Sequence, residues 1–307
     1  MKLGKLKNNP TVGVIAPAYI PVQERLEQGI LYLENRGFHV KRGNTLSLAH
    51  GYFAGDDSQR LSDLHQMFLD PEVDLIICAR GGWGGLRIVD KLDYDLIANH
   101  PKPFIGYSDV TTLQLAIWKM TGMPSLSGPM VAVEMGRGIE AFTAEHFWGQ
   151  IYNRSEKYPI SLSESGGQIF RAGKAKGTLL GGCLSMVAGL LGTPYIPDFT
   201  DTILFLEDVG EKPYRIDRYL AQLTQAGVFE KIKGLILGKF EDCVEDPGEV
   251  TFSLPEILSD YFRHINLPVI VEFPYGHGAK KITMPIGGEC ELNAQSGIIS
   301  FANIFST

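Results

Sequence analysis

The stretch that decides the fold is Leu75-Ile76-Ile77-Cys78-Ala79, a short apolar run that leads into a glycine-rich segment at residues 80–85. An apolar run of this length that ends at glycines is typical of a strand buried on both faces, as in a parallel sheet. Similar apolar, β-branched runs lie at residues 11–17 and 104–107. We therefore expect parallel strands in the N-terminal half of the chain.

Helical patterns alternate with these strands. Apolar residues recur near helical spacing between Val22 and Arg36, and the pattern predicts further helices at residues 59–69, 86–92 and 110–121, with another strand at 38–41. This alternation predicts a doubly wound, mostly parallel α/β domain. Functional sites in such domains lie at the carboxyl ends of the strands.

The C-terminal half alternates less regularly. A helix is expected near residues 215–226, and strands are expected at 202–206, 234–238, 269–273, 290–293 and 297–301. Between about Phe147 and Lys176 the pattern weakens among polar residues and glycines. We place an N-terminal α/β domain at residues 1–150, a linker at 151–175, and a smaller mixed α/β domain, rich in strands, at 176–307.

Composition narrows the class of protein. The 307 residues include 28 basic and 35 acidic ones, a formal net charge of −7, so nucleic acid is not an expected partner. Residues 1–10 lack the apolar core of a secretory signal, and no apolar stretch approaches the roughly 20 residues that span a bilayer. We expect a cytoplasmic protein that does not bind a membrane.

The cysteines give no sign of a metal centre or a disulfide framework. Cys78, Cys183, Cys243 and Cys290 are scattered, without a Cys-x-x-Cys pair. No His-Glu-x-x-His pattern or Cys/His cluster is present in the sequence. Free structural thiols and no bound metal are the expectation.

Ser108 stands where the apolar run at residues 104–107 meets the expected helix at 110–121. Such a turn exposes a side chain at the sheet edge and aims backbone N–H groups and the positive helix end at it, which suits an acyl-transfer nucleophile. The alternative is that Ser108 or Asp109 only caps the helix, and the local stretch by itself favours capping. The Gly-x-Ser-x-Gly pattern is incomplete because Val110 replaces the second glycine.

The glycine-rich segment, residues 80–85, follows the strand that ends at Ala79. Its glycines let backbone N–H groups approach a substrate oxygen and form an oxyanion hole. The alternative is a tight turn over which Trp83 packs as a lid. The segment matches neither a phosphate-binding loop nor a dinucleotide-binding pattern.

Two acidic residues and one histidine follow strands of the C-terminal half. Glu207 and Asp208 come directly after residues 202–206 and should point to opposite sides, so only one of them can orient a histidine; the alternative is exposed loop charge. His277 lies between Gly276 and Gly278, an uncrowded position that suits a general base.

Basic residues offer candidates for binding a substrate carboxylate. Arg80 begins the glycine-rich segment, and Lys280 and Lys281 follow His277 closely. The alternative for each is a solvated surface charge.

Taken in order, these motifs resemble the LD-carboxypeptidase family of serine peptidases, whose typical member removes the terminal D-alanine from murein tetrapeptides. The resemblance covers most of the chain. It rests on Val14-Ile15-Ala16-Pro17, Arg80-Gly81-Gly82-Trp83-Gly84, Lys102-Pro103-Phe104-Ile105-Gly106-Tyr107-Ser108-Asp109, Gly181-Gly182, Leu206-Glu207-Asp208 and Gly276-His277.

The resemblance implies a catalytic triad and an oxyanion hole. Ser108 would be the nucleophile, His277 the general base and Glu207 the carboxylate that orients it, with the backbone N–H groups of Gly82 and Asp109 as the oxyanion hole. It also implies a site between two domains, a homodimer, no cofactor, and a cytosolic muropeptide as substrate in peptidoglycan recycling.

Two positions depart from the family pattern. The family usually has tyrosine where Trp83 stands, and an asparagine where Cys183 follows Gly181-Gly182. Cys183 lacks the amide, so the exact peptide specificity is open. Arg80 and Trp83 are the candidates for substrate contact.

Three other functions remain to be weighed. A related family member hydrolyses acyl-aminoacyl nucleotide conjugates of the microcin type for self-immunity, but such proteins lack the Arg-Gly-Gly-aromatic-Gly form. A non-catalytic small-molecule binding protein is also built from two α/β domains around a cleft. A glutamine-amidotransferase-like enzyme would need a cysteine in place of Ser108.

Overall fold

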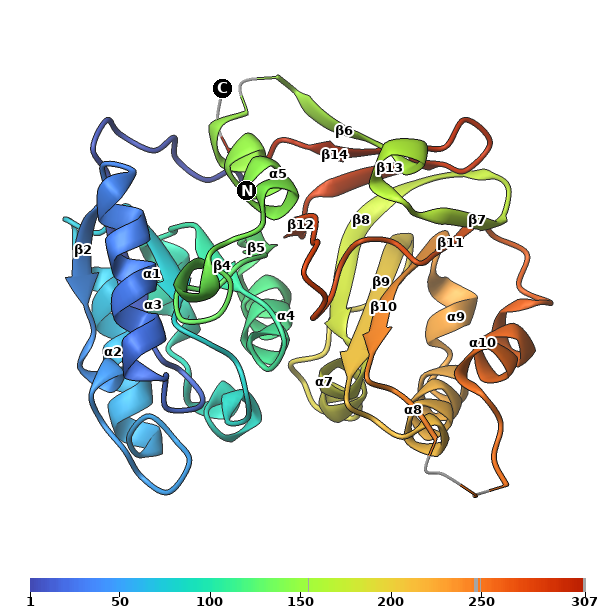
Figure 1. Ribbon diagram of the computed structural model, residues 1–307, viewed down its shortest axis with the longest axis horizontal. Helices are drawn as coiled ribbons and strands as arrows, with labels where there is room; N and C mark the ends of the chain where they lie inside the picture. The colour runs from blue at the N-terminus through green and yellow to red at the C-terminus, as the bar shows by residue number, and fades with distance from the viewer. Residues whose placement is uncertain (154, 246–247, 249, 306–307) are drawn as a thin grey trace.

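The computed structural model describes residues 1–153, 155–245, 248 and 250–305. The chain forms two lobes side by side, each built around its own sheet and its own apolar core (Figure 1). Within the described residues the first sheet has six strands in the order β12-β5-β4-β3-β1-β2, and the second has eight in the order β6-β14-β13-β8-β9-β10-β11-β7.

The N-terminal lobe is the doubly wound α/β unit that the sequence predicts. Its five parallel strands are β1 (Thr11–Ile15), β2 (His39–Arg42), β3 (Leu75–Cys78), β4 (Phe104–Gly106) and β5 (Ser125–Ser127). Its helices are α1 (Gln23–Asn35), α2 (Asp57–Leu69), α3 (Tyr94–Asn99), α4 (Val110–Thr121) and α5 (Ala141–Tyr152). The apolar runs are buried because helices cover both faces of a parallel sheet.

The C-terminal lobe is mixed and rich in strands, as predicted. Four of its strands are parallel: β8 (Lys174–Cys183), β9 (Thr202–Val209), β10 (Gly234–Glu241) and β11 (Val269–Val271). Antiparallel strands flank them: β6 (Lys157–Ser161), β7 (Gln168–Arg171), β13 (Glu289–Asn293) and β14 (Ile298–Ala302). The helices are α6 (Leu162–Ser165), α7 (Leu184–Leu190), α8 (Pro213–Gln225), α9 (Val228–Lys231) and α10 (Leu254–Phe262).

One predicted helix is wrong. Residues 86–92 do not form an α-helix but fall in two 3₁₀ turns, Gly85–Arg87 and Val89–Lys91. Hydrogen bonds between residues three apart close these turns. They run from the Ile88 N–H to the Gly85 carbonyl and from the Lys91 N–H to the Ile88 carbonyl.

The two lobes are joined by more than one crossing of the chain. Residues 157–171, within the segment expected as a linker, form β6 and β7, the two edge strands of the second sheet. Strand β12 (Met284–Ile286) leaves the C-terminal lobe and pairs antiparallel with β5 in the first sheet. The first sheet therefore contains a strand from the C-terminal half of the sequence.

No helix in the described part of the chain is long and apolar enough to cross a membrane. The four cysteines are buried and free.

Candidate active site

Ser108 lies on a strained turn between β4 and α4. Its φ of 63° is in the left-handed region that residues other than glycine seldom adopt, a conformation that recurs at functional sites. The turn is tight, since a Cβ added at Gly106 would come within 2.9 Å of the Val110 side chain. Asp109 occupies the N-cap position of α4, but its side chain makes no capping hydrogen bond. The capping interpretation is therefore wrong for Asp109, and the geometry is that of a nucleophile elbow.

The Asp109 carboxylate instead holds the glycine-rich segment. It accepts hydrogen bonds from the N–H groups of Gly84 (3.2 Å) and Gly85 (2.8 Å). Burial raises the pKa of Asp109 to about 6, although these two N–H groups act in the opposite direction. The carboxylate thereby fixes the glycine-rich segment to the turn that carries Ser108.

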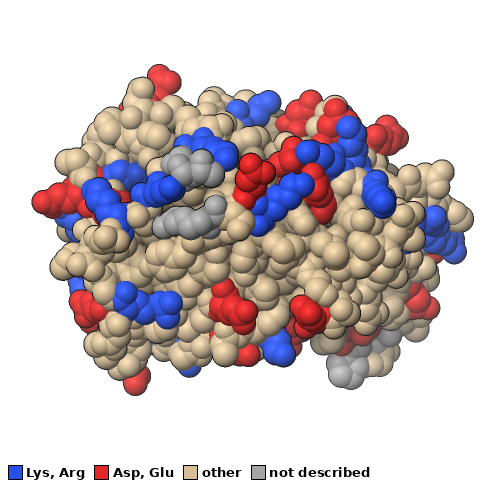
Figure 2. Space-filling view, turned by 90° about the horizontal axis from the view of Figure 1, so that it is seen from above, with Lys and Arg blue, Asp and Glu red and all other residues tan. Residues whose placement is uncertain are grey.

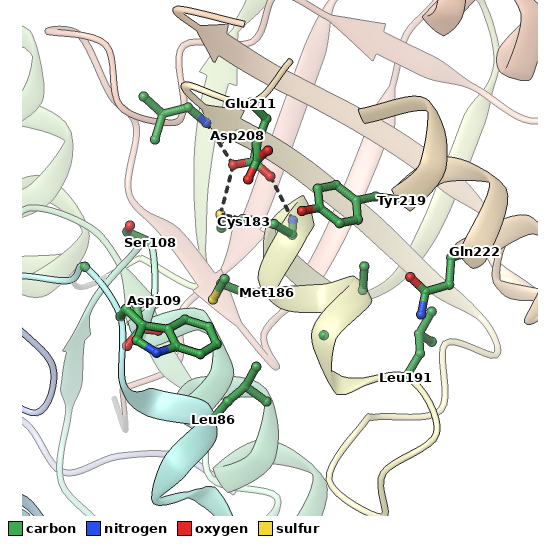
Figure 3. A pocket seen from close by; sticks show the side chains of 16 residues that line it. Leu86, Ser108, Asp109, Cys183, Met186, Leu191, Asp208, Glu211, Tyr219 and Gln222 are labelled. Carbon is green, nitrogen blue, oxygen red and sulfur yellow. Dashed lines mark hydrogen bonds between the residues drawn. The ribbon is translucent and has the colours of Figure 1, made fainter. Parts of the chain in front are cut away.

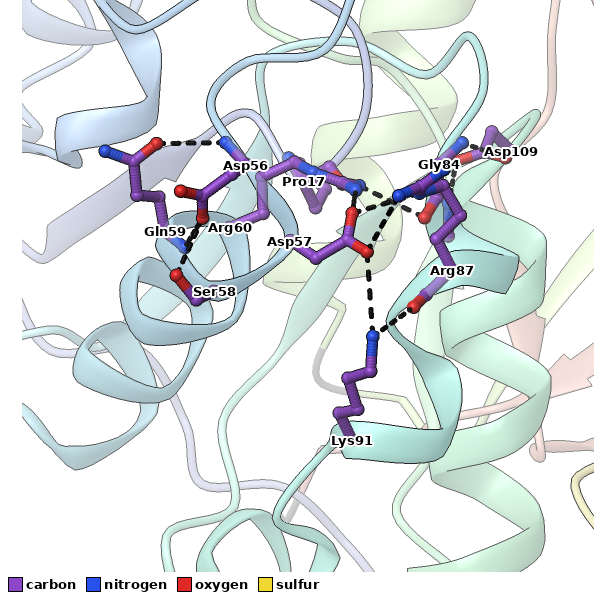
Figure 4. Close-up of polar contacts among 11 residues, drawn as sticks. Pro17, Asp56, Asp57, Ser58, Gln59, Arg60, Gly84, Arg87, Lys91 and Asp109 are labelled. Atoms are coloured by element: carbon purple, nitrogen blue, oxygen red, sulfur yellow. Dashed lines mark hydrogen bonds and ion pairs between the residues drawn. The ribbon is translucent and has the colours of Figure 1, made fainter. Parts of the chain in front are cut away.

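Arg60 holds the same segment from its other side (Figure 4). Its fully buried guanidinium, which α2 supplies, donates to the Pro17 carbonyl at 2.7 Å and to the Gly84 carbonyl at 3.1 Å. It also pairs with Asp57. Nothing in the local sequence around Arg60 or Asp109 indicated these roles, because both bonds join residues more than 20 positions apart.

Gly82 is a glycine for steric reasons. Its φ is 119°, and a Cβ added there would lie 2.5 Å from the Tyr19 ring. Among the hydrogen bonds of the described residues, neither the Gly82 N–H nor the Asp109 N–H donates to a protein acceptor. Gly82 and Asp109 line the same cavity as Ser108. These two N–H groups are thus available beside Ser108.

Glu207 and His277, which the family resemblance pairs, are in contact. The His277 Nδ1 and a Glu207 carboxylate oxygen are 2.8 Å apart, and the Glu207 side chain is fully buried. Gly276 permits this approach, since a Cβ added there would come within 2.8 Å of the same carboxylate oxygen. With Nδ1 occupied, Nε2 is the ring nitrogen that remains to act as a base.

Asp208 serves the opposite side of β9. Its carboxylate accepts the N–H groups of Ser185 (2.8 Å) and Val209 (2.9 Å) and contacts the Cys183 thiol at 3.4 Å. Burial raises its pKa to about 6, and the neighbouring charge of Glu207 adds to the shift. Cys183 is therefore part of the cavity wall next to the end of β9.

Ser108 and His277 are linked through Tyr107, and no direct hydrogen bond joins them in the described residues. Tyr107, which precedes Ser108, places its ring 5.0 Å from the His277 ring, centroid to centroid. Catalytic hydrogen bonds often tighten only when substrate binds. Tyr107 therefore connects its neighbour in the chain, Ser108, with the Glu207–His277 pair.

A cavity of about 570 Å³ opens beside Ser108 (Figure 3). The N-terminal lobe contributes Trp83, whose side chain is partly exposed, and the C-terminal lobe contributes Asp208, Glu211 and Tyr219. The volume is ample for a short peptide segment. The charged residues that line it, in the described chain, are all acidic.

Three arginines, Arg80, Arg137 and Arg25, lie close enough that their charges act on one another. The Arg80 guanidinium lies over the Tyr19 ring and donates to the Ile20 carbonyl at 3.3 Å. Its pKa is lowered, chiefly by burial and in addition by the charges of Arg137 and Arg25. Arg137 and His277 line a second cavity of about 270 Å³. None of the three arginines forms an ion pair within the described residues.

Nothing in the described residues suggests a metal centre. No group of three or more His, Cys, Asp or Glu side chains is arranged so that it would hold a metal ion there.

Comparison with known proteins decides the family. The model of the LD-carboxypeptidase N-terminal domain matches residues 12–128, and that of the LD-carboxypeptidase C-terminal domain matches residues 176–292. A probable murein peptide carboxypeptidase of Bacillus subtilis is 40% identical over 289 residues, which are 94% of this chain and 90% of that protein. The chain belongs to the LD-carboxypeptidase family. It is thus a serine-type LD-carboxypeptidase, a hydrolase of peptide bonds.

Solved structures agree with this LD-carboxypeptidase assignment. The crystal structure of a muramoyltetrapeptide carboxypeptidase from Oxalobacter formigenes is 31% identical, with a TM-score of 0.85 over 97% of this chain and 100% of that one. The microcin C7 self-immunity protein of Escherichia coli is more distant, at 26% identity over 93% of this chain and 90% of that protein. The murein peptidases are therefore the relatives that best match this chain among these three.

Proposed function

We propose that this LD-carboxypeptidase releases the terminal D-alanine from murein tetrapeptides, with Ser108, His277 and Glu207 as its triad. The observation that carries the proposal is the 2.8 Å contact between His277 and buried Glu207, at the lobe junction where Ser108 stands on a strained turn. Two relatives of the chain are named as murein peptide carboxypeptidases, which supports this substrate class.

In the proposed first step, His277 takes the proton of the Ser108 hydroxyl as the serine oxygen attacks the carbonyl carbon of the peptide bond to D-alanine. The carbonyl oxygen becomes negative and is bound by the N–H groups of Gly82 and Asp109. The C–N bond then breaks, and His277 gives its proton to the leaving amine. Glu207 keeps the imidazole oriented and stabilises its positive charge.

In the second step a water molecule cleaves the acyl-enzyme. His277 removes a proton from the water, whose oxygen attacks the ester carbonyl, and the proton returns to the Ser108 oxygen as the ester bond breaks. The products are D-alanine and a tripeptide. None of these steps calls for a metal or an organic cofactor.

Arg80 supports the carboxypeptidase direction of the proposal. A carboxypeptidase must recognise the terminal carboxylate, and the Arg80 guanidinium, with Arg137 and Arg25 near it, has no acidic partner in the described residues. Planar guanidinium groups bind carboxylates by paired hydrogen bonds. Trp83 lines the cavity beside Ser108, where it would contact the acyl part of the peptide.

A direct test compares substrates side by side. The protein is incubated with a murein tetrapeptide and, separately, with an aminoacyl nucleotide conjugate, and products are identified by mass. Release of D-alanine from the tetrapeptide is expected. Exclusive cleavage of the conjugate would favour the microcin-type function, and binding without turnover, with no fluorophosphonate labelling of Ser108, would favour a binding protein.

The cellular setting and assembly belong to the same proposal. Recycling of cell-wall peptides would place the protein in the cytoplasm, and the family resemblance implies a homodimer. Cell fractionation and light scattering of the purified protein test these two points.

A further inference from the structure

A buried ion pair that the proposed reaction does not use lies behind the catalytic residues. Lys281 pairs with Glu134, and the Lys281 side chain is fully buried. Lys281 was expected as a solvated charge or as a ligand for substrate carboxylate, and neither fits a buried side chain with an internal partner. Buried charges are costly, so this pair needs an explanation.

Both members of the pair contact Tyr107. The Tyr107 hydroxyl donates to the Glu134 carboxylate at 2.8 Å, and the Lys281 ammonium lies over the Tyr107 ring, 3.6 Å from its centroid. The second carboxylate oxygen of Glu134 accepts the Met130 N–H at 2.9 Å. Tyr107 is itself buried. The hydroxyl and the ring of Tyr107 are therefore held by separate contacts.

Tyr107 stands between the nucleophile and the base. It is joined to Ser108 by a peptide bond, and its ring packs on that of His277. The Glu207 contact fixes one edge of the imidazole at Nδ1. The Tyr107 ring adds a contact with the imidazole that limits rotation about the remaining side-chain torsion.

The pair also connects the two parts of the site. Glu134 lies in the N-terminal lobe, whereas Lys281 follows the His277 loop by four residues. The Lys281 N–H donates to the Thr143 hydroxyl of α5 at 3.0 Å, so its backbone is fixed as well as its side chain. A displacement of Lys281 would thus move both Tyr107 and the chain that carries His277.

We infer that Glu134 and Lys281 are positioning residues, which use Tyr107 to align the His277 imidazole with the Ser108 hydroxyl. The inference rests on the proposed roles of Ser108 and His277. Glu134 and Lys281 would thus affect the rate of the chemical step as well as the stability of the fold.

The double variant Glu134→Gln/Lys281→Met separates positioning from stability. Each single substitution leaves one buried charge without its partner and should lower the Tm, whereas removal of both charges is often neutral for stability. In the double variant we expect the Tm to return toward that of the wild type. The kcat for the tetrapeptide should nevertheless fall about tenfold or more with little change in KM, since small misplacements of catalytic groups act on the rate.

The control is an exposed ion pair far from the site. Lys157 and Glu291 lie 2.6 Å apart on β6 and β13. The matched double variant Lys157→Met/Glu291→Gln should retain the wild-type kcat. A double variant at Glu134 and Lys281 with wild-type Tm and wild-type kcat would overturn the inference.

Two further measurements keep the test decisive. If the double variant does not fold, Tyr107→Phe retains the ring but removes the hydrogen bond to Glu134, and an unchanged kcat in that variant would overturn the inference. The rate at which a fluorophosphonate labels Ser108 reports alignment without a peptide. If the wild type is labelled but cleaves no tetrapeptide, the proposed substrate is wrong, while slower labelling of the double variant would still support positioning.

Discussion

The turn that carries Ser108 and the loop that carries His277 are held in place by different means. The Ser108 turn depends on backbone: a left-handed φ, glycines that admit no Cβ, and N–H and carbonyl groups held by Asp109 and Arg60. The His277 loop depends on side chains, through Glu207 and Tyr107. The nucleophile side should therefore be sensitive to added volume, and the base side to lost hydrogen bonds and charge.

The largest expected effect removes the nucleophile itself. Ser108→Ala should lower kcat by roughly 10⁴-fold or more, since no neighbouring group replaces the hydroxyl. The Tm should change little, because the Ser108 hydroxyl makes no hydrogen bond within the described residues. Steady-state kinetics with a tetrapeptide, together with thermal melts, measure both. Retention of full activity would remove Ser108 from the mechanism.

In the His277 loop, which side chains hold in place, Glu207→Gln should lower kcat by about 10⁴-fold. The amide can donate to Nδ1 and so favour the imidazole tautomer that has no free Nε2 lone pair. The size of the variant side chain is unchanged, so the loop should stay in place. A crystal structure with the imidazole unmoved and kcat intact would show that Glu207 does not orient His277.

Beside the Ser108 turn, which backbone contacts hold in place, Gly82→Ala should lower kcat by about 10² to 10³-fold. This is the range for loss of one oxyanion donor. The added Cβ would meet Tyr19 at 2.5 Å, and the segment must shift to relieve the overlap. Gly122→Ala is the matched control, since Gly122 also has a positive φ of 69° but no atom within 4 Å of the added Cβ. Equal kcat values in the two variants would contradict the steric argument.

The smallest expected effect is on the pH dependence of stability. It involves two buried acids, Asp109 beside the Ser108 turn and Asp208 beside Glu207. The pKa values of Asp109 and Asp208 are both raised from 3.8 to about 6. Between about pH 4 and pH 6 the unfolded state has lost these protons while the folded state keeps them, so the free energy of unfolding should fall as the pH rises through this window. Each group contributes about 3 kcal/mol to that fall, from roughly two pKa units.

Asp208→Asn tests this pH dependence at the end of β9. The variant should show a shallower fall in the free energy of unfolding between pH 4 and pH 6, measured by urea denaturation at a series of pH values. Asp109→Asn should flatten the curve too, and both variants should have a lower absolute stability, because an amide cannot accept two backbone N–H groups, one on each end, as these carboxylates do. Curves parallel to the wild type would contradict the pKa directions.

Features that depend on a local pattern or on the order of motifs could be predicted from the sequence. The apolar strands β3 and β4 are visible as runs, and the family resemblance indicated that Glu207 and His277 belong together. The edge strands β6 and β7 were not recognised, because β7 is mostly exposed and β6 buries only Ile160. An apolar run therefore marks a buried strand and gives no warning of an exposed one.

The supports of the site were also missed. Asp109, Arg60 and the Glu134–Lys281 pair act across long separations in sequence, where neither spacing nor composition records a contact. The helix expected at residues 86–92 does not form, because the chain there closes two 3₁₀ turns and becomes extended at Leu92.

The position of strand β12 affects the order in which the fold can be completed during synthesis. Because residues 284–286 complete the edge of the first sheet beside β5, that sheet remains unfinished until the ribosome has made nearly all of the described chain. At about 5 to 20 residues per second, many seconds separate the synthesis of Ser108 from that of His277. The nascent chain thus carries Ser108 long before His277, and the edge of the first sheet beside β5 is completed only when β12 has been made.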